Sequence, residues 1–474
     1  MKLERFVGVS VHGYRNFDIE FNDDITFLTG INGSGKTTVL NAIIALITPS
    51  LRSLAELEYV TLSIQFENEG KSHRILGSRE KDTISLQASG VAEVLVFQRF
   101  IRENATPPYR EADYEQEYYR ELVAKHASHP VLQMIAGLPT PMFLGLDRRV
   151  RFSDEPARAR SAIQTRSGRN VFGGSLVQSL ADAAGLAENS YRDTLIAAGR
   201  LGEQLRRDML LQLLAIEPEQ GFGGAISAPK RADIQELAKM RHDVEALPRI
   251  LGLPRDEVDK RIVPFLDLLD GYARQIPSDL NVEKFIRERP PSNEQFRALL
   301  GWSANSPQLR RIRFLSRMVG SYNEELKDIT SHTSKYTDLV NQFLIDSGKK
   351  LQFDQNGYIS FTIEGVEGNR SISSLSSGEG QIFVILTQLS FNPSAREANV
   401  FLIDEPEISL HVQWQELFVD SIISANPRIQ YIMATHSPSI ILDKLDRCVD
   451  TVVGGKAPTA KRPRVRQRGE RTQA

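Results

Sequence analysis

A glycine-rich stretch near the start of the chain has the residue types and spacing of a phosphate-binding loop. Residues 30–38 read Gly-Ile-Asn-Gly-Ser-Gly-Lys-Thr-Thr and match the pattern G-x-x-x-x-G-K-[ST]. Glycines at this spacing let backbone N–H groups curl around phosphates at a helix N-terminus, where the helix dipole favours negative charge. We expect Lys36 to contact the β- and γ-phosphates of ATP and Thr37 to hold Mg²⁺. The residues expected to bind the nucleotide here are Asn32, Gly33, Ser34, Gly35, Lys36, Thr37 and Thr38.

Two adjacent carboxylates follow an apolar run late in the chain. Residues 400–403 are Val-Phe-Leu-Ile, and Asp404 and Glu405 come directly after them. A parallel strand that is buried on both faces delivers charged groups at its C-terminal end, so the run has the form of a Walker B strand. We expect Asp404 to contact the Mg²⁺ shell and Glu405 to orient or deprotonate the attacking water. Taken alone, the run also fits a core strand followed by a capped helix.

Two further segments could face the phosphates. Residues 374–381 read Ser-Leu-Ser-Ser-Gly-Glu-Gly-Gln and precede an apolar helical run at 382–389, so a second glycine-rich turn opens a helix. Ser376 followed by Glu379 is also a capping box, and the two interpretations are compatible. Residues 431–434 form a short apolar strand that leads to His436. A lone histidine at a strand end is more often structural than catalytic.

The segments around these motifs predict an α/β nucleotide-binding fold. An apolar strand at 25–28 and a buried helix at 39–47 flank the glycine-rich loop, which is the setting that a P-loop requires. Period-two alternation at 7–12 and 17–21 predicts a hairpin. Further strands are predicted at 60–66, 73–76 and 83–87 and should form an antiparallel sheet beside the site. We also expect a surface helix at 110–120, a buried strand at 142–146 and a mobile loop at 151–175.

Helical periodicity dominates the middle of the chain. Prolines should break this region into short helices, and no heptad is sustained over several turns, so we expect a compact or hairpin-like helical domain without a long coiled coil. These prolines are at positions 229, 248, 254, 264, 277, 290 and 291. The predicted division is 1–175 and 347–450 for the two halves of an ATPase head, 176–346 for a helical insertion and 451–474 for a basic disordered tail.

Composition and charge favour a soluble protein of a reducing compartment. The chain has 474 residues, is 41% hydrophobic and 25% charged, and has one cysteine, Cys448, which permits no intramolecular disulfide. We see no secretory signal and no apolar run of the length that a membrane helix needs, so we expect a cytoplasmic protein that does not contact a membrane. The net charge of -2 hides a basic tail, since residues 456–474 contain seven Lys or Arg and one Glu. This tail is predicted to be disordered and is a candidate for contact with DNA phosphates or an acidic surface; a solvated terminus without function is the alternative.

Taken in order, the motifs GINGSGKTT, LSSGEGQ, FLIDEPE, SLH and ATHSP resemble the ABC-type ATPase head shared by the SMC, RecF and OLD groups. The resemblance implies a mixed sheet with flanking helices, an antiparallel β subdomain and a large helical insertion. It also implies a head-to-head dimer around two ATP molecules, in which Ser377, Gly378 and Glu379 of one subunit contact the γ-phosphate bound to the other. Residues 409–411 would form the D-loop and His436 would be the catalytic switch histidine. Gln98 is a candidate Q-loop residue that contacts the nucleotide and Mg²⁺.

Departures from that pattern narrow the expected function. The insertion is too short for the long arms of SMC proteins, and we expect no TOPRIM nuclease after His436. A head of this kind resembles the ATPase subunits of phage-defence systems such as Septu and PARIS and of some retrons. We therefore expect an oligomeric ATPase that regulates a separate effector, a nuclease, in phage defence, with DNA as a further expected partner. A RecF-like DNA-binding ATPase of repair is the rival, and a transport ATPase is disfavoured because its compact head has no such insertion.

Overall fold

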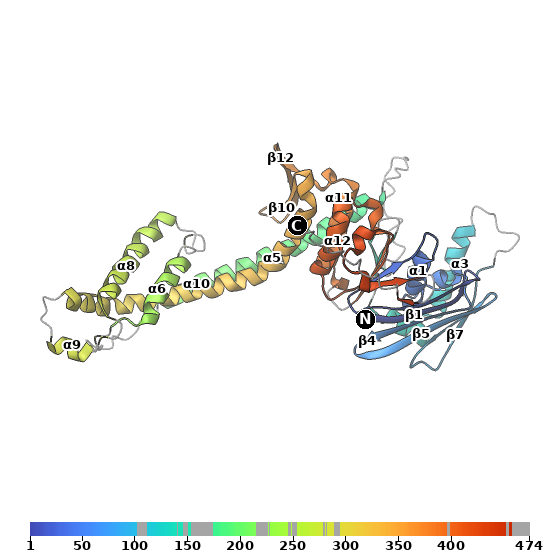
Figure 1. Cartoon of the computed structure of the whole chain (residues 1–474), viewed down its shortest axis with the longest axis horizontal. Coiled ribbons are helices and arrows are strands. Elements are labelled where there is room, and N and C mark those ends of the chain that lie inside the picture. Colours follow the sequence, from blue (N-terminus) through green and yellow to red (C-terminus); the bar gives the residue numbers. More distant parts are fainter. Residues whose placement is uncertain are drawn as a thin grey trace, which may run out of the picture. The chain divides into compact units, whose positions relative to one another are not determined.

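The computed structural model describes residues 1–101, 111–139, 141–145, 150–152, 174–214, 226, 228–244, 248, 254–277, 280, 282–288, 294–395, 399–451 and 455–456. The chain divides into two compact units. Unit 1 comprises residues 1–190 and 335–474, and unit 2 comprises residues 191–334. Unit 1 contains the sheets, and unit 2 is helical (Figure 1).

A largely parallel sheet forms the centre of unit 1. Its order is β16-β15-β3-β14-β13-β8-β9, with antiparallel pairing only at the two edges. Alternate residues of its central strands face opposite cores: Leu402 and Ile432 lie in one cluster, Phe401 and Tyr431 in the other. Burial on both faces explains why these strands are continuous apolar runs. The strands are β3 (Ile25–Thr29), β8 (Met142–Leu144), β9 (Val150–Phe152), β13 (Val400–Asp404), β14 (Gln430–Ala434), β15 (Cys448–Asp450) and β16 (Gly455–Lys456).

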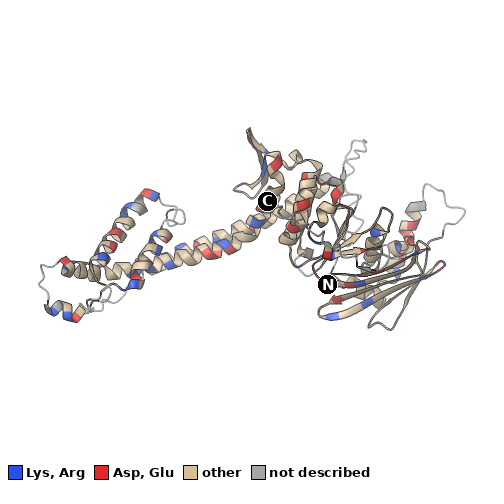
Figure 2. Ribbon diagram, viewed as in Figure 1, with Lys and Arg blue, Asp and Glu red and all other residues tan. Residues whose placement is uncertain are grey.

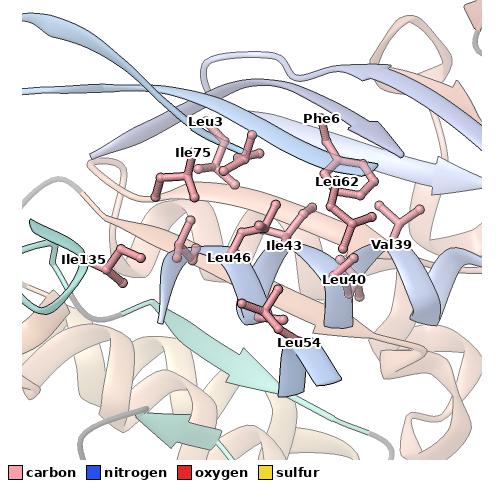
Figure 3. Close-up of a cluster of buried hydrophobic side chains, with 14 of the residues drawn as sticks. Leu3, Phe6, Val39, Leu40, Ile43, Leu46, Leu54, Leu62, Ile75 and Ile135 are labelled. Carbon is pink, nitrogen blue, oxygen red and sulfur yellow. The ribbon is translucent and has the colours of Figure 1, made fainter. Parts of the chain in front are cut away.

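Helix α1 (Lys36–Ile47) lies between this sheet and a second, antiparallel sheet. Figure 3 shows Val39, Ile43 and Leu46 of α1 packed with Phe6 and Leu62 of the antiparallel strands. Contact on two sides explains why α1 is apolar around most of its circumference. The antiparallel sheet has the order β2-β1-β4-β5-β6-β7 and confirms the predicted hairpin and strands. Its strands are β1 (Lys2–Val11), β2 (Arg15–Glu20), β4 (Thr61–Asn68), β5 (Lys71–Glu80), β6 (Thr83–Ala88) and β7 (Leu95–Gln98).

The other face of the parallel sheet is covered by helices α11 (Ser377–Phe391) and α12 (Val412–Ala425). Helix α11 is buried from Gly378 to Phe391, because it packs between the sheet and further helical residues, including Tyr336. Tyr336 is fully buried, and its hydroxyl lies 2.8 Å from that of Thr387 in α11. A small antiparallel sheet precedes α11 and consists of β10 (Lys349–Phe353), β11 (Ile359–Ile363) and β12 (Val366–Arg370).

Unit 2 contains parts of two long helices, α5 (Gly174–Leu214) and α10 (Glu294–Leu344), and α6 (Arg231–Val244), α8 (Arg255–Gln275) and α9 (Val282–Glu288) between them. The expectation of short helices throughout is wrong, because α5 has 41 residues and α10 has 51. Leu205 and Met209 of α5 pack on Val319 of α10. Residues of both charges are interspersed along the helices of this unit (Figure 2).

Other expectations meet the structure only in part. The predicted surface helix is confirmed as α3 (Glu111–Lys125). Of the predicted mobile loop, residues 151–152 belong to strand β9, α5 begins at Gly174, and the rest lies outside the described residues. Thr451 is buried and residues 455–456 pair with β15, whereas the basic residues beyond 456 also lie outside the described part. Within the residues described, no helix is both long and apolar enough to traverse a bilayer.

Candidate nucleotide-binding site

The glycine-rich loop connects β3 to α1 and turns at three glycines. Gly30, Gly33 and Gly35 have φ angles of 144°, 78° and 96°, which glycine adopts without a steric penalty. A Cβ atom at Gly35 would also lie only 2.7 Å from the Phe17 ring of β2. Glycine is therefore required at this position by both backbone angle and space. The tight turn places the loop beside the first turn of α1, whose N–H groups have no partner within the helix and can bind an anion.

Lys36 begins α1, and its side chain is buried rather than extended into solvent. Its Nζ donates a hydrogen bond to the carbonyl oxygen of Gly30 at 3.2 Å and lies in hydrogen-bond contact with Nε2 of His436. Burial lowers the pKa of Lys36, and the nearby carboxylates of Glu405 and Asp404 oppose that shift. The cation expected to meet the phosphates is thus already at the loop, held by groups that a phosphate could replace.

Adjacent parallel strands bring the other candidate residues to the same edge. Strand β14 lies between β3 and β13 and is parallel to both, so the C-terminal ends of all three meet there. Asp404 is the last residue of β13, Glu405 follows it, and His436 comes two residues after β14. Glu405 has a φ of 44° and donates its N–H to the carbonyl oxygen of Ala434 at 2.9 Å. Its Oε1 lies 3.9 Å from Nε2 of His436, so the two expected catalytic side chains are neighbours.

Thr37 and Asp404 form an oxygen-rich pair suited to Mg²⁺. Thr37 Oγ1 donates a hydrogen bond to Asp404 Oδ1 at 3.1 Å. Asp404 Oδ2 is buried and has no hydrogen-bond partner among the described residues. Burial raises the pKa of Asp404 to about 6, although the bond from Thr37 acts in the opposite direction. Mg²⁺ prefers oxygen ligands and typically takes one or two carboxylates together with substrate phosphates, so these residues fit the expected metal.

A pocket of about 440 Å³ lies over these groups, within the usual size range of ligand clefts. Nine of its ten lining residues were expected from the sequence, and Glu407 was not. The lining residues are Asn32, Gly33, Ser34, Gly35, Lys36, Thr37, Thr38, Glu405, Glu407 and His436. The structure therefore assembles the P-loop, Glu405 and His436 in one pocket.

The glycine-rich turn at 374–381 does not line this pocket. Ser376 caps α11 in a full capping box with Glu379, which confirms that interpretation. Ser377 is exposed, whereas Glu379 is buried and its Oε2 accepts hydrogen bonds from Lys349 Nζ at 2.8 Å and from the Ser376 N–H at 2.6 Å. Ser377 is therefore available at an exposed helix N-terminus, but the carboxylate of Glu379 is already engaged within its own chain.

Gln98 is placed differently from the other candidates. It ends β7 at the edge of the antiparallel sheet, where its Nε2 donates to Thr83 Oγ1 at 3.0 Å. It is not among the residues that line the pocket. The structure does not bring Gln98 to the nucleotide site of its own chain, and a role for it in binding nucleotide or Mg²⁺ stays a prediction.

Sequence reasoning assigned no role to two residues that contact the site. Glu407 accepts the backbone N–H of His436 at 2.6 Å, and its position two residues after Glu405 was a signal that could have drawn attention to it. Thr451 Oγ1 lies 2.8 Å from Ser34 Oγ of the P-loop, and both residues are buried. No local pattern connects Ser34 with Thr451, because 417 positions separate them in the sequence.

Two family models match the chain. A model described as an AAA domain matches residues 8–145, and a model described as "AAA domain, putative AbiEii toxin, Type IV TA system" matches residues 262–443. The first contains the P-loop, and the second contains the capped turn at 374–381, the paired carboxylates and His436. Together the two matches support an ABC-type ATPase of the SMC/RecF-like kind.

The chain resembles, over part of its length, two curated relatives that are described as retron probable ATPases. It is 24% identical over 128 residues to the retron Vc95 probable ATPase of Vibrio cholerae serotype O1 biovar El Tor, a match covering 25% of each chain. It is 26% identical over 177 residues to the retron Ec83 probable ATPase of Escherichia coli, covering 34% of this chain and 32% of the relative. The chain thus matches about a quarter and a third of the length of these two relatives.

The solved structures that are similar to this ATPase include two Smc head domains. One, from Pyrococcus furiosus, has an extended coiled coil and is bound to the C-terminal domain of ScpA; the identity is 12% and the TM-score 0.35, with 93% of this chain and 91% of that chain covered. The other, from Pyrococcus yayanosii, has a coiled coil and joint; the identity is 14% and the TM-score 0.32, with 93% of both chains covered.

Proposed function

We propose that this ATPase binds and hydrolyses ATP in a pocket that a second copy of the chain completes. The observation that carries the proposal is the distribution of the motifs. One chain brings the P-loop, Glu405 and His436 to a single pocket, while Ser377 lies at an exposed helix N-terminus that does not line it. The N-terminus of α11 can bind phosphate from a partner, because its first N–H groups have no acceptors within the helix.

Several residues in or beside the pocket have roles that their positions support. Lys36 would exchange its contacts with Gly30 and His436 for the β- and γ-phosphates. Thr37 and Asp404 would hold Mg²⁺, which supplies positive charge to the phosphates when it is bound. Glu405 would accept a proton from the attacking water or orient it, with His436 close enough to contact the same γ-phosphate. Ser377 of the partner would donate hydrogen bonds to that phosphate and exclude water from it.

The wider role that we propose is regulation of a separate effector nuclease in phage defence. The support is the similarity to retron ATPases, whose matched segments span only part of their length. We further propose a cytoplasmic location, in agreement with the single cysteine. DNA is a proposed partner of the basic residues beyond position 456.

Complementation between two inactive variants tests the composite site. Lys36→Ala removes the phosphate-binding cation, and Ser377→Arg blocks the exposed helix N-terminus, so each variant alone should hydrolyse little ATP. Random mixing puts half of the chains in heterodimers, and each heterodimer has one intact site. The mixture should therefore recover about a quarter of the wild-type rate if the dimer is two-fold symmetric.

As the control, each variant is mixed with a differently tagged copy of itself, and this mixture should recover no ATP hydrolysis. Mixed oligomers are confirmed by capture through one tag. If captured mixed oligomers stay inactive, the pocket is not completed by Ser377 of a partner.

A further inference from the structure

The loop that carries His436 is held on one side by Glu407. One oxygen of Glu407, Oε1, accepts two hydrogen bonds: from the hydroxyl of Thr435 at 2.9 Å and from the backbone N–H of His436 at 2.6 Å. The second oxygen, Oε2, is buried and has no hydrogen-bond partner among the described residues. These two bonds fix the backbone at the point where the His436 side chain begins.

The same loop is held on its other side by Gln415 of α12. Gln415 Oε1 accepts the hydroxyl of Ser437 at 2.6 Å, and its Nε2 donates to the carbonyl oxygen of Leu410 at 2.9 Å and to that of Glu407 at 3.4 Å. The Ser437 N–H donates in turn to Thr435 Oγ1 at 3.0 Å. The Gln415 side-chain oxygen is thus bonded to the histidine loop, and its side-chain nitrogen is bonded to the segment 406–410.

These bonds join two segments that have different neighbours. The ring of His436 contacts Lys36, lies 3.9 Å from Glu405 and lines the pocket. The segment 406–410 contains Ile408, which is exposed, and it adjoins the pocket through Glu407. A shift of the histidine loop cannot occur without moving this segment or breaking the bonds from Glu407 and Gln415.

We propose that Glu407 and Gln415 are positioning residues that hold the His436 loop and the segment 406–410 as one body. Glu407 acts through the backbone of His436, and Gln415 acts through Ser437. A change in the contacts of His436 is thereby transmitted to the exposed segment 406–410. This inference rests on the proposed function for its catalytic consequence, although the bonds themselves can be tested without ATP.

The catalytic test compares two substitutions of Glu407. Glu407→Ala removes the acceptor of both hydrogen bonds and should lower kcat by about 10- to 100-fold, the size expected when a reacting group is displaced by roughly an ångström. The Kd for ATP should change by less than about threefold, because Lys36 and the P-loop remain. Glu407→Gln keeps an accepting oxygen and should stay within about threefold of the wild-type kcat. The matched control is Glu416→Ala, an exposed glutamate on α12.

A double-mutant cycle separates positioning from a general loss of structure. If Glu407 acts through His436, Glu407→Ala should have no further effect on kcat in a His436→Ala background. Independent effects that multiply would overturn the assignment. So would a Glu407→Gln variant as slow as Glu407→Ala, or a Glu407→Ala variant whose kcat equals that of the wild type.

Hydrogen exchange tests the same bonds without any hydrolysis. In nucleotide-free protein, Glu407→Ala should speed exchange of the His436 amide by about tenfold or more, because its acceptor is removed, while Glu407→Gln should not. Gln415→Ala should speed exchange at Ser437, since the bond that holds its side chain is lost. If exchange responds as expected but the wild type does not hydrolyse ATP, the proposed function fails and the positioning inference stands. Unchanged exchange in all these variants would overturn the inference itself.

Discussion

Replacing Lys349 with methionine should destabilise unit 1 by about 3–5 kcal/mol, because it leaves a buried carboxylate without its cation. Lys349 Nζ lies 2.8 Å from Oε2 of Glu379, and the two side chains are only 15% and 3% exposed. The same Nζ donates to the carbonyl oxygen of Ser374 at 2.8 Å. The substitution therefore removes both the charge partner of Glu379 and one bond that orders the turn before α11.

The destabilisation caused by Lys349→Met should depend on pH, and the sign of that dependence follows from the pKa of Glu379. Burial alone would raise the pKa of Glu379, but hydrogen bonds from Lys349 and from the Ser376 N–H outweigh it and hold the pKa below its usual value of 4.5. In the wild type, the Glu379 carboxylate contributes its full stability above pH 4.5. This contribution is lost as the pH falls through the pKa of Glu379 in the folded state, which is lower. Without Lys349 the folded pKa should rise. The difference between wild type and variant should therefore narrow as the pH is lowered from 7 towards 4.

Fluorescence can report on unit 1 alone. The chain has two tryptophans: Trp302 is buried in the core of unit 2, and Trp414 packs on the core of unit 1. In a Trp302→Phe background, urea unfolding followed at Trp414 gives the free energy of unfolding of the relevant unit. Lys350→Met, the exposed neighbour on β10, is the matched control and should change stability by less than about 0.5 kcal/mol.

A second substitution completes the test. Glu379→Gln added to Lys349→Met removes the orphaned charge and should restore at least half of the lost stability. The reasoning is refuted if Lys349→Met costs less than about 1 kcal/mol at pH 7. It is also refuted if the loss of unfolding free energy in the double variant equals the sum of the losses in the two single variants.

Two further predictions concern the pocket. Gly35→Ala should weaken ATP binding by at least about tenfold more than Gly33→Ala, because both positions have positive φ but only a Cβ at Gly35 meets the Phe17 ring; equal effects in a nucleotide-binding titration would contradict this. Asp404→Asn should stabilise the nucleotide-free protein above pH 6 by at most about 3 kcal/mol, because a folded pKa of about 6 against 3.8 means that stability falls as the pH rises between these values. The same variant should lose stabilisation by Mg²⁺ and ATP. If the Tm values of variant and wild type differ by a constant amount from pH 4 to 8, the predicted pH dependence is absent.

The local chemistry of the site was readable from the sequence, because short patterns determine it. Glycine spacing and the flanking apolar runs predicted the turn between β3 and α1. An apolar run that ends in Asp404 and Glu405 predicted a strand end at the site, since a strand buried on both faces has little freedom in composition. These features depend on neighbours within a few residues, and the structure places nearly all of them at one pocket.

The two long helices, α5 and α10, show where the prediction of short helices from proline positions failed. The seven prolines that predicted short helices lie outside α5 and α10, and one of them, Pro264, lies inside α8 without ending it. Helix α10 itself contains Pro307 and continues through it. Absence of a heptad argues against a regular coiled coil, but it does not prevent two helices from packing at a few positions such as Leu205 and Val319.

The sequence by itself determined which residues could bind phosphate and metal, because the spacing within each motif carries that chemistry. Only the tertiary structure decided how the motifs meet. The order β3, β14, β13 places His436 between the P-loop and Asp404, and no local pattern records strand order. The engagement of Glu379 by Lys349 and the hold of Glu407 on the His436 backbone likewise join residues about thirty positions apart. Such contacts depend on how elements pack, since the side chain that satisfies a buried polar group is set by proximity in space and not by distance along the chain.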